Sequence, residues 1–152
     1  MALGIAPWRG HDGGVSSKTG KVRERVAALD ARGWDPRYAG WFECFNGGQY
    51  YEAHDVLEDL WLEEGQGAAN HGFYKGLIQV AGAFVHLGKG RRGPAGALLR
   101  LARTYLGRYP ARHEGLDVAG LIARCEAWER GVAGGVDVGR PAVSLSGREA
   151  GG

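Results

Sequence analysis

Three residues whose side chains can bind metal or transfer protons lie close together near residue 55 of the 152-residue chain. His54, Asp55 and Glu58 belong to the segment FNGGQYYEAHDVLEDLW, which is rich in aromatic, histidine and carboxylate side chains. His54 and Glu58 are four positions apart, so both point to the same side of a helix. An imidazole and a carboxylate so placed can hold a divalent cation, or the carboxylate can orient the imidazole as a general base.

A helix over residues 49–64 would sort these side chains into three stripes. Apolar residues form a core stripe, with Tyr50 and Trp61 at its edge: Ala53, Val56, Leu57 and Leu60. Acidic residues form a stripe expected to face solvent: Glu52, Asp59 and Glu63. The third stripe is mixed, and its Tyr and Leu are unusual for a surface: Tyr51, His54, Asp55, Glu58 and Leu62. The third stripe is therefore expected to face another element.

A second helix, over residues 71–87, is the expected partner. Its apolar residues cover most of the circumference, which predicts a largely buried helix. The remaining polar residues Lys75, Gln79 and His86 fall on one line. Buried polar groups need partners, and the short loop over residues 65–70 predicts an antiparallel arrangement. We therefore expect this line to meet the third stripe.

This arrangement leaves three interpretations open. The catalytic candidates are His54, Asp55, Glu58, Gln79 and His86, and the weaker ligand-binding candidates Tyr51 and Lys75 lie beside them. If a divalent metal binds, which is the less favoured alternative, its ligands are His54, Glu58 and His86. The same residues could instead form a structural network that satisfies hydrogen bonds inside a bundle. Asn46, before the first of the two helices, is expected to cap it.

The composition predicts one all-α domain, a compact bundle of four to five helices over residues 21–130. Residues 1–20 read as a disordered arm and residues 131–152 as a disordered tail, because neither stretch shows a hydrophobic period. Asp35 and Pro36 predict a helix start, followed by an aromatic face at Tyr38, Trp41, Phe42 and Phe45. Further helices are expected over residues 95–109 and 117–130, and no strand is expected.

Charge is segregated along the chain although the net charge is only +2. The stretch Glu52–Glu64 holds six acidic and no basic residues, and Lys89–Arg112 holds seven basic and no acidic residues. Arg100 and Arg103 in the basic block are weak candidates for binding phosphate or nucleic acid. Pairing of the two blocks, within the chain or in a homo-oligomer, is favoured over nucleic acid because the net charge is near neutral. The sequence identifies no other partner.

The cysteines and the hydropathy of the sequence indicate in which cellular compartment the protein is expected. The two cysteines, Cys44 and Cys125, show no CxxC spacing, which favours a reducing compartment. The first residues lack the pattern of a signal peptide, and no stretch has the roughly 20 apolar residues of a membrane span. We therefore expect a cytoplasmic protein with no membrane partner.

The segments FNGGQYYEAHDVLEDLW, FYKGLIQVAGAFVH and GALLRLA resemble a bacterial family described as a domain of unknown function, DUF309. The resemblance covers about residues 41–106 and implies a small all-helical fold. The matching positions are Phe45, Asn46, Tyr51, Glu52, His54, Glu58, Trp61, Gly76, Gln79 and His86. Asp55 stands where the family usually has Glu, and the turn before Gly96 lacks an expected Asn.

Because the family has no known activity, the resemblance implies a fold and candidate residues only. One hypothesis is a small hydrolase-like protein that uses His54 with Glu58 or Asp55. The alternative is a non-catalytic helical module that binds a protein or an anionic ligand through the basic block. The sequence leaves open whether the protein is an enzyme.

Overall fold

The computed structural model describes residues 17–27, 29 and 31–148, which form six helices and one short hairpin. The helices are α1 (Ser17–Ala27), α2 (Pro36–Asn46), α3 (Tyr50–Glu64), α4 (His71–Gly88), α5 (Arg92–Leu106) and α6 (Val118–Ala133). The two-residue strands β1 (Arg112–His113) and β2 (Leu116–Asp117) pair antiparallel between α5 and α6. The all-α fold predicted from the sequence is confirmed. The hairpin was not expected, because two-residue strands are too short to show alternation.

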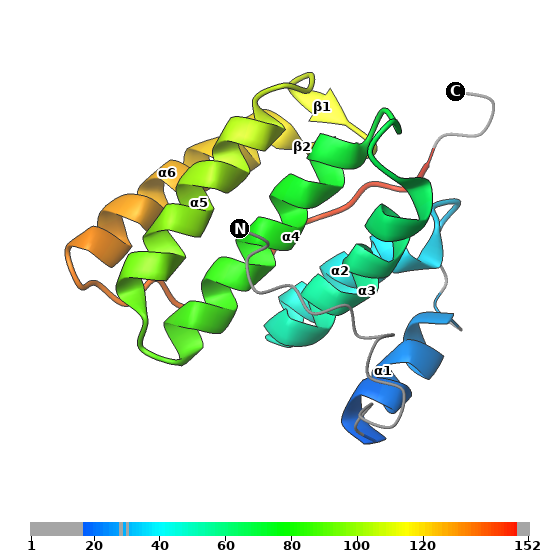
Figure 1. The fold of residues 1–152 in the computed structure, drawn as a ribbon, viewed down its shortest axis with the longest axis horizontal. Coiled ribbons are helices and arrows are strands. Elements are labelled where there is room, and N and C mark those ends of the chain that lie inside the picture. The colour runs from blue at the N-terminus through cyan, green and yellow to red at the C-terminus, as the bar shows by residue number, and fades with distance from the viewer. Residues whose placement is uncertain (1–16, 28, 30, 149–152) are drawn as a thin grey trace.

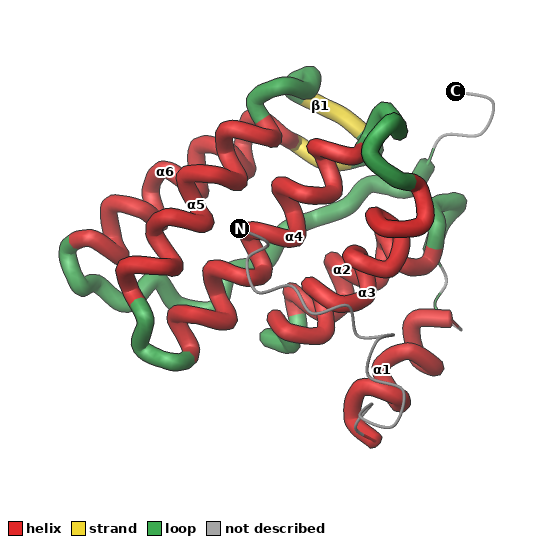
Figure 2. The backbone as a smooth tube through the Cα atoms, in the orientation of Figure 1, coloured by secondary structure: helices red, strands yellow, loops and turns green. Residues whose placement is uncertain are grey.

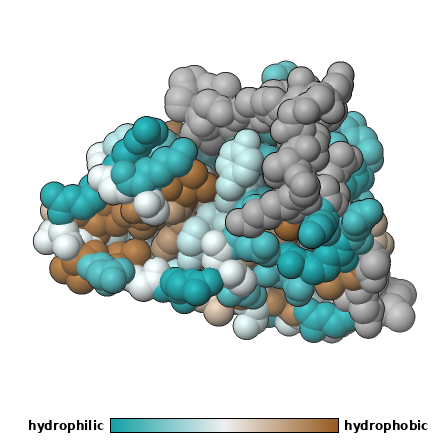
Figure 3. Space-filling view, turned by 90° about the horizontal axis from the view of Figure 1, so that it is seen from below, coloured by the Kyte–Doolittle hydropathy of each residue, from teal (hydrophilic) through white to brown (hydrophobic). Residues whose placement is uncertain are grey.

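Helices α2 to α6 form the bundle, and each packs against the next along the chain (Figures 1 and 2). Helix α4 lies between α3 and α5, which explains why most of its circumference is apolar. Helix α1 packs at the side of α2 and α3 through the buried Val22 and Val26. None of the described helices is long and apolar enough to cross a membrane. At one end of the bundle, hydrophilic side chains border a hydrophobic area (Figure 3).

Helix α2 begins and packs as the sequence predicts. The Asp35 carboxylate accepts a 2.8 Å hydrogen bond from the Arg37 amide, and Pro36 is the first helical residue. The aromatic face is buried: Tyr38, Trp41, Phe42 and Phe45 are all at most 4% exposed. Trp41 stacks on Phe45 at 4.7 Å, and Phe45 contacts Phe84 of α4 edge-on. These aromatic contacts hold α2 against α4. Helix α3 packs against both of these helices, so its position is fixed as well.

Helices α4 and α5 approach closely at a glycine. A Cβ atom on Gly76 would lie 2.8 Å from Cγ of Leu106 and 3.3 Å from the Ala102 carbonyl oxygen. Gly88, in the last turn of the same helix, has open space around it. The glycine at position 76 therefore sets the distance between the two helices.

We expect Gly76→Ala to lower the free energy of unfolding by about 1–3 kcal/mol, because an added methyl forces packed groups apart. The matched change Gly88→Ala should leave stability unchanged or raise it by up to about 1 kcal/mol through helix propensity. Urea denaturation of both variants measures the difference. Equal stability of the two variants would contradict the close approach.

The chain beyond α6 corrects one expectation. Residues 131–133 continue α6, and residues 134–148 run back across α2 and the hairpin without regular structure instead of forming a disordered tail. Val143 and Leu145 are buried, and backbone hydrogen bonds tie Ser146 to Gly115 and Arg148 to Arg32. Residues 1–16 of the expected N-terminal arm and 149–152 of the expected tail lie outside the described residues. Residues 17–20, expected in the arm, belong to α1.

Asn46 holds this C-terminal segment. Its Nδ2 donates to the Val143 carbonyl at 2.9 Å, and its Oδ1 accepts from the Val143 amide at 2.7 Å. The expectation that Asn46 caps the following helix is wrong, since Gln49 occupies the N-cap position of α3 and makes no side-chain cap bond. Three residues connect α2 to α3, and the side-chain amide of Asn46 faces Val143, which is distant in sequence.

Candidate functional site

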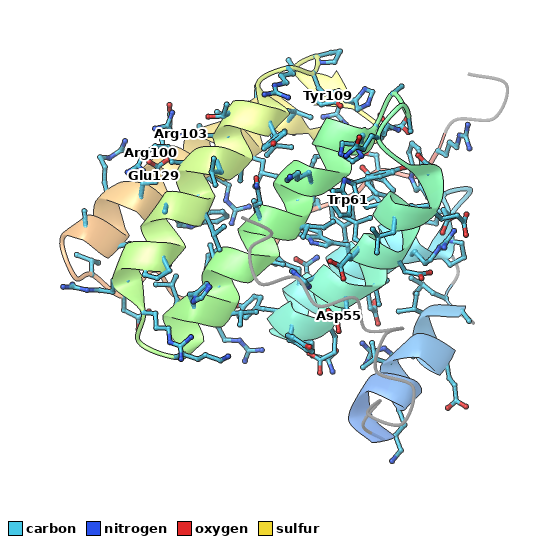
Figure 4. The ribbon with its side chains drawn as sticks, in the orientation of Figure 1. Asp55, Trp61, Arg100, Arg103, Tyr109 and Glu129 are labelled. Carbon is cyan, nitrogen blue, oxygen red and sulfur yellow. The ribbon has the colours of Figure 1, made fainter. Side chains whose placement is uncertain are left out.

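Helix α3 brings His54, Asp55 and Glu58 together in the interior. The three residues are 7%, 1% and 0% exposed, so the middle of the mixed stripe predicted from the sequence is buried, whereas Tyr51 at its end is exposed. One potential ligand atom from each residue lies within 4.8 Å of the other two. Asp55 is on the half of α3 that adjoins the end of α4 (Figure 4). A compact group of one imidazole and two carboxylates is therefore present.

Asp55 is positioned to orient His54. The His54 Nδ1 and Asp55 Oδ1 atoms are 3.0 Å apart, so a proton on Nδ1 is donated to the carboxylate. This bond leaves Nε2 for a ligand, a common arrangement for metal-binding histidines. The second Asp55 oxygen, Oδ2, is buried and has no hydrogen-bond partner in the described part of the chain. In the cation-free chain Asp55 therefore supports the imidazole, and it can become a ligand of the same ion as His54 only if this hydrogen bond is given up.

The register of α3 against α4 places Gln79 opposite this group. The ring of Tyr50 lies 5.2 Å from that of Phe84, and the ring of Trp61 lies 4.9 Å from that of His71. The residue numbers rise along α3 and fall along α4 between these two contacts. Counting in proportion from one contact to the other puts Gln79 at the same height as His54. Gln79 is 2% exposed, and its Oε1 finds no hydrogen-bond partner among the described residues. Gln79 is thus a buried amide at the height of the buried carboxylates, and its oxygen is a polar group that still needs a partner.

His86 and Lys75 take other positions. The sequence predicted His86 as the third metal ligand beside His54 and Glu58. In the structure the third residue of the group is Asp55, and His86 does not belong to it. Burial, followed by the positive charges of Arg91 and Lys89, lowers the pKa of His86. The Lys75 ammonium lies 5.6 Å from the Trp61 ring and 5.4 Å from the Tyr105 ring. Lys75 thus bridges three helices through cation–π contacts.

Tyr51 connects the group to solvent. Its side chain is 49% exposed, and its ring lies parallel to that of His54 at 6.2 Å. Burial, and after it the negative charges of Asp55, Glu58 and Glu52, raise the pKa of Tyr51. The phenol therefore keeps its proton at neutral pH and can donate a hydrogen bond to a bound molecule.

Several charged residues of the two blocks pair with residues outside both blocks, and pairing between neighbouring chains stays a prediction. The guanidinium of Arg103 forms two hydrogen bonds with Glu129 of α6, one of them 3.2 Å long, and Arg100 lies 3.9 Å from the same carboxylate (Figure 4). In the acidic block, Asp59 and Glu63 bind Arg37 at 2.8 and 3.0 Å. Arg37 and Glu129, which the sequence analysis did not single out, are therefore the partners seen among the described residues.

Both cysteines are free and buried. Burial raises the pKa of Cys44 to about 11 and that of Cys125 to about 12. A thiol that keeps its proton is a poor nucleophile and a poor metal ligand. The two thiols are therefore not candidates for a reactive or metal-binding group.

Comparison with known proteins gives a family for this part of the chain. The model of the domain of unknown function DUF309 matches residues 39–98, a segment that includes all of α3 and α4. No curated protein and no solved structure matches the chain. The resemblance seen in the sequence is confirmed: the DUF309 model matches residues 39–98, a segment that includes the His54 group and Gln79.

Proposed function

We propose that His54, Asp55 and Glu58 bind a divalent cation and that the site performs a hydrolytic reaction. The observation that carries this proposal is the placement of three buried potential ligands within 4.8 Å of one another. Metal–ligand bonds of about 2.0–2.2 Å at tetrahedral angles would separate the ligand atoms by about 3.4 Å. Small side-chain rotations are therefore enough to close the three residues around one ion.

The energetics of burial support a cation in this position. Two ionised carboxylates next to each other in the interior repel, and each loses its hydration. A divalent cation between them would compensate both charges. Imidazole and carboxylate donors suit zinc, manganese and iron, whereas magnesium and calcium prefer oxygen ligands alone. The donor set therefore favours a transition metal or zinc.

The arrangement also provides the parts of a hydrolytic site. Three protein ligands leave coordination positions for water, and a bound cation lowers the pKa of that water towards neutrality. All three ligand residues come from adjacent turns of α3, so they are already grouped before a cation or a substrate arrives, and coordination by Asp55 would replace its hydrogen bond with His54. Gln79 faces the group from α4, and its amide can hold a substrate carbonyl or hydroxyl. Tyr51 offers a second hydrogen-bond donor on the solvent side.

Calorimetric titration of zinc or manganese into the chelator-treated, tag-free full chain tests the proposal. We expect one cation per chain, and His54→Ala and Glu58→Gln should each weaken binding at least tenfold. Glu63→Gln, a carboxylate change on the exposed side of the same helix, is the matched control and should bind as the parent does. Elemental analysis of protein purified without an affinity tag checks the stoichiometry.

One result would favour a structural network instead. If the parent takes up no stoichiometric cation, and His54→Ala and Glu58→Gln lower the melting temperature by many degrees, the polar group serves only to hold α3 against α4. Circular dichroism of each variant shows whether it is folded. A folded variant that loses cation binding supports the proposal.

A further inference from the structure

The turn between α4 and α5 carries cations that have no acidic partner. Residues 88–94 are all exposed, and they include Lys89, Arg91 and Arg92. Within the described part of the chain, none of these three side chains forms an ion pair or a side-chain hydrogen bond. The other arginines of the basic block are engaged: Arg100 and Arg103 with Glu129, Arg108 over the ring of Tyr105, and Arg112 with Ser146. The turn is therefore the part of the basic block available to an anion.

The α4 helix connects this turn to the proposed cation site. Gln79 stands at the level of His54, and His86 follows two turns later on the same side of α4. Lys89 is ten residues beyond Gln79, a distance of about 15 Å along a helix axis. The amides of Lys89 and Arg91 both donate to the His86 carbonyl, so the turn folds back over the end of α4. An anion held by Lys89 and Arg91 would thus lie about 15 Å from the His54 group.

Two groups lie between the turn and the cluster. His86 is half-buried, and its Nδ1 has no hydrogen-bond partner in the described residues. Tyr51 is half-exposed beside His54. A molecule that reached from the turn to the cluster would meet an imidazole nitrogen and a phenol, both of which can hydrogen-bond to neutral polar groups.

We propose that the substrate of this site is a phosphorylated small molecule whose phosphate is held by Lys89 and Arg91, away from the bond that is cleaved. The inference rests on the proposed cation site, because the reacting end of the molecule must lie at His54, Asp55 and Glu58. Two neighbouring cations compensate a doubly charged phosphate. The exposed backbone amides that begin α5 add donors, and Gly93 leaves space for close approach. The phosphate acts as a handle that positions the molecule.

Phosphorus NMR with phenyl phosphate tests this placement. Phenyl phosphate should bind the chelator-treated full chain, and Lys89→Glu/Arg91→Glu should weaken this binding at least tenfold. Arg108→Glu/Arg130→Glu changes charge equally at other exposed arginines and should bind as the parent does. With manganese bound, the relaxation of the phosphorus signal measures its distance from the ion, which is expected to be about 15 Å.

The possible outcomes are distinguishable. If manganese binds but phenyl phosphate does not, the proposed phosphate site at Lys89 and Arg91 is wrong while the cation site stands. The same holds if phosphorus lies in the first coordination shell of manganese. Phenyl phosphate binding that depends on Lys89 and Arg91 in a protein that takes up no manganese would instead overturn the proposed cation site. If Lys89→Glu/Arg91→Glu weakens binding of single-stranded RNA and not of phenyl phosphate, the turn recognises nucleic acid and the inference is wrong.

Discussion

Deleting residues 136–152 is expected to lower the free energy of unfolding by about 3–6 kcal/mol, because the deletion exposes surface that the segment covers. Val143 and Leu145 are 4% and 8% exposed in the intact chain. Both side-chain hydrogen bonds of Asn46 would also lose their partner. Urea denaturation followed by circular dichroism measures the loss.

A shorter deletion provides the control. Removing only residues 149–152 leaves all the contacts described above in place and should change stability by less than about 0.5 kcal/mol. Asn46→Ala keeps the segment but removes its clamp, and should cost about 1–3 kcal/mol. If the long deletion unfolds at the same urea concentration as the intact chain, residues 136–148 contribute nothing to the fold.

The helices could be predicted because their signals are local. Asp35 and Pro36 are enough to start α2, and the spacing of Tyr38, Trp41 and Phe45 is enough to give it a buried face. The apolar circumference of α4 likewise follows from its own sequence. These features depend on residues within a few turns of one another, so a single sequence contains the information.

The C-terminal segment could not be predicted for the opposite reason. Its two buried residues, Val143 and Leu145, are two positions apart, which is too short a pattern to distinguish from chance. Its stability comes from backbone bonds to Arg32 and Gly115 and from the side chain of Asn46. These partners are distant in sequence, and an asparagine between two helices more often serves as a cap.

The spatial grouping of the candidate residues was predicted in part, and their function stays a prediction. Helical spacing places His54, Asp55 and Glu58 on one side of α3 whatever the rest of the fold does. Helical spacing also assigns His86 to the side of α4 that faces α3. It does not give the position of His86 along the helix axis relative to the residues of α3. His86 is seven residues beyond Gln79, about 10 Å along the helix, which places it beyond the His54 group. The ion pairs of Arg37 and Glu129 depend on tertiary neighbours in the same way.

Replacing Asp55 by Asn is expected to change stability and cation binding in opposite directions. The amide keeps an oxygen that can accept from His54 but removes one of two adjacent buried charges. In chelator-treated protein at pH 8, loss of that repulsion should stabilise the fold by about 1 kcal/mol, or raise the melting temperature by about 3 °C. The affinity for zinc or manganese should fall at least tenfold, because a neutral amide is a weaker ligand than a carboxylate.

Asp59→Asn is the matched control, since it is the same change four residues along α3. Asp59 binds Arg37 at 2.8 Å and does not belong to the His54 group. This variant should lose up to about 1 kcal/mol of stability and keep the cation affinity of the parent. Destabilisation of metal-free Asp55→Asn with unchanged cation affinity would show that Asp55 is a structural partner of His54. If metal-free Asp55→Asn is more stable than the parent and Asp59→Asn is less stable, the interior carboxylate pair lowers the stability of the fold. This is expected of residues that serve binding.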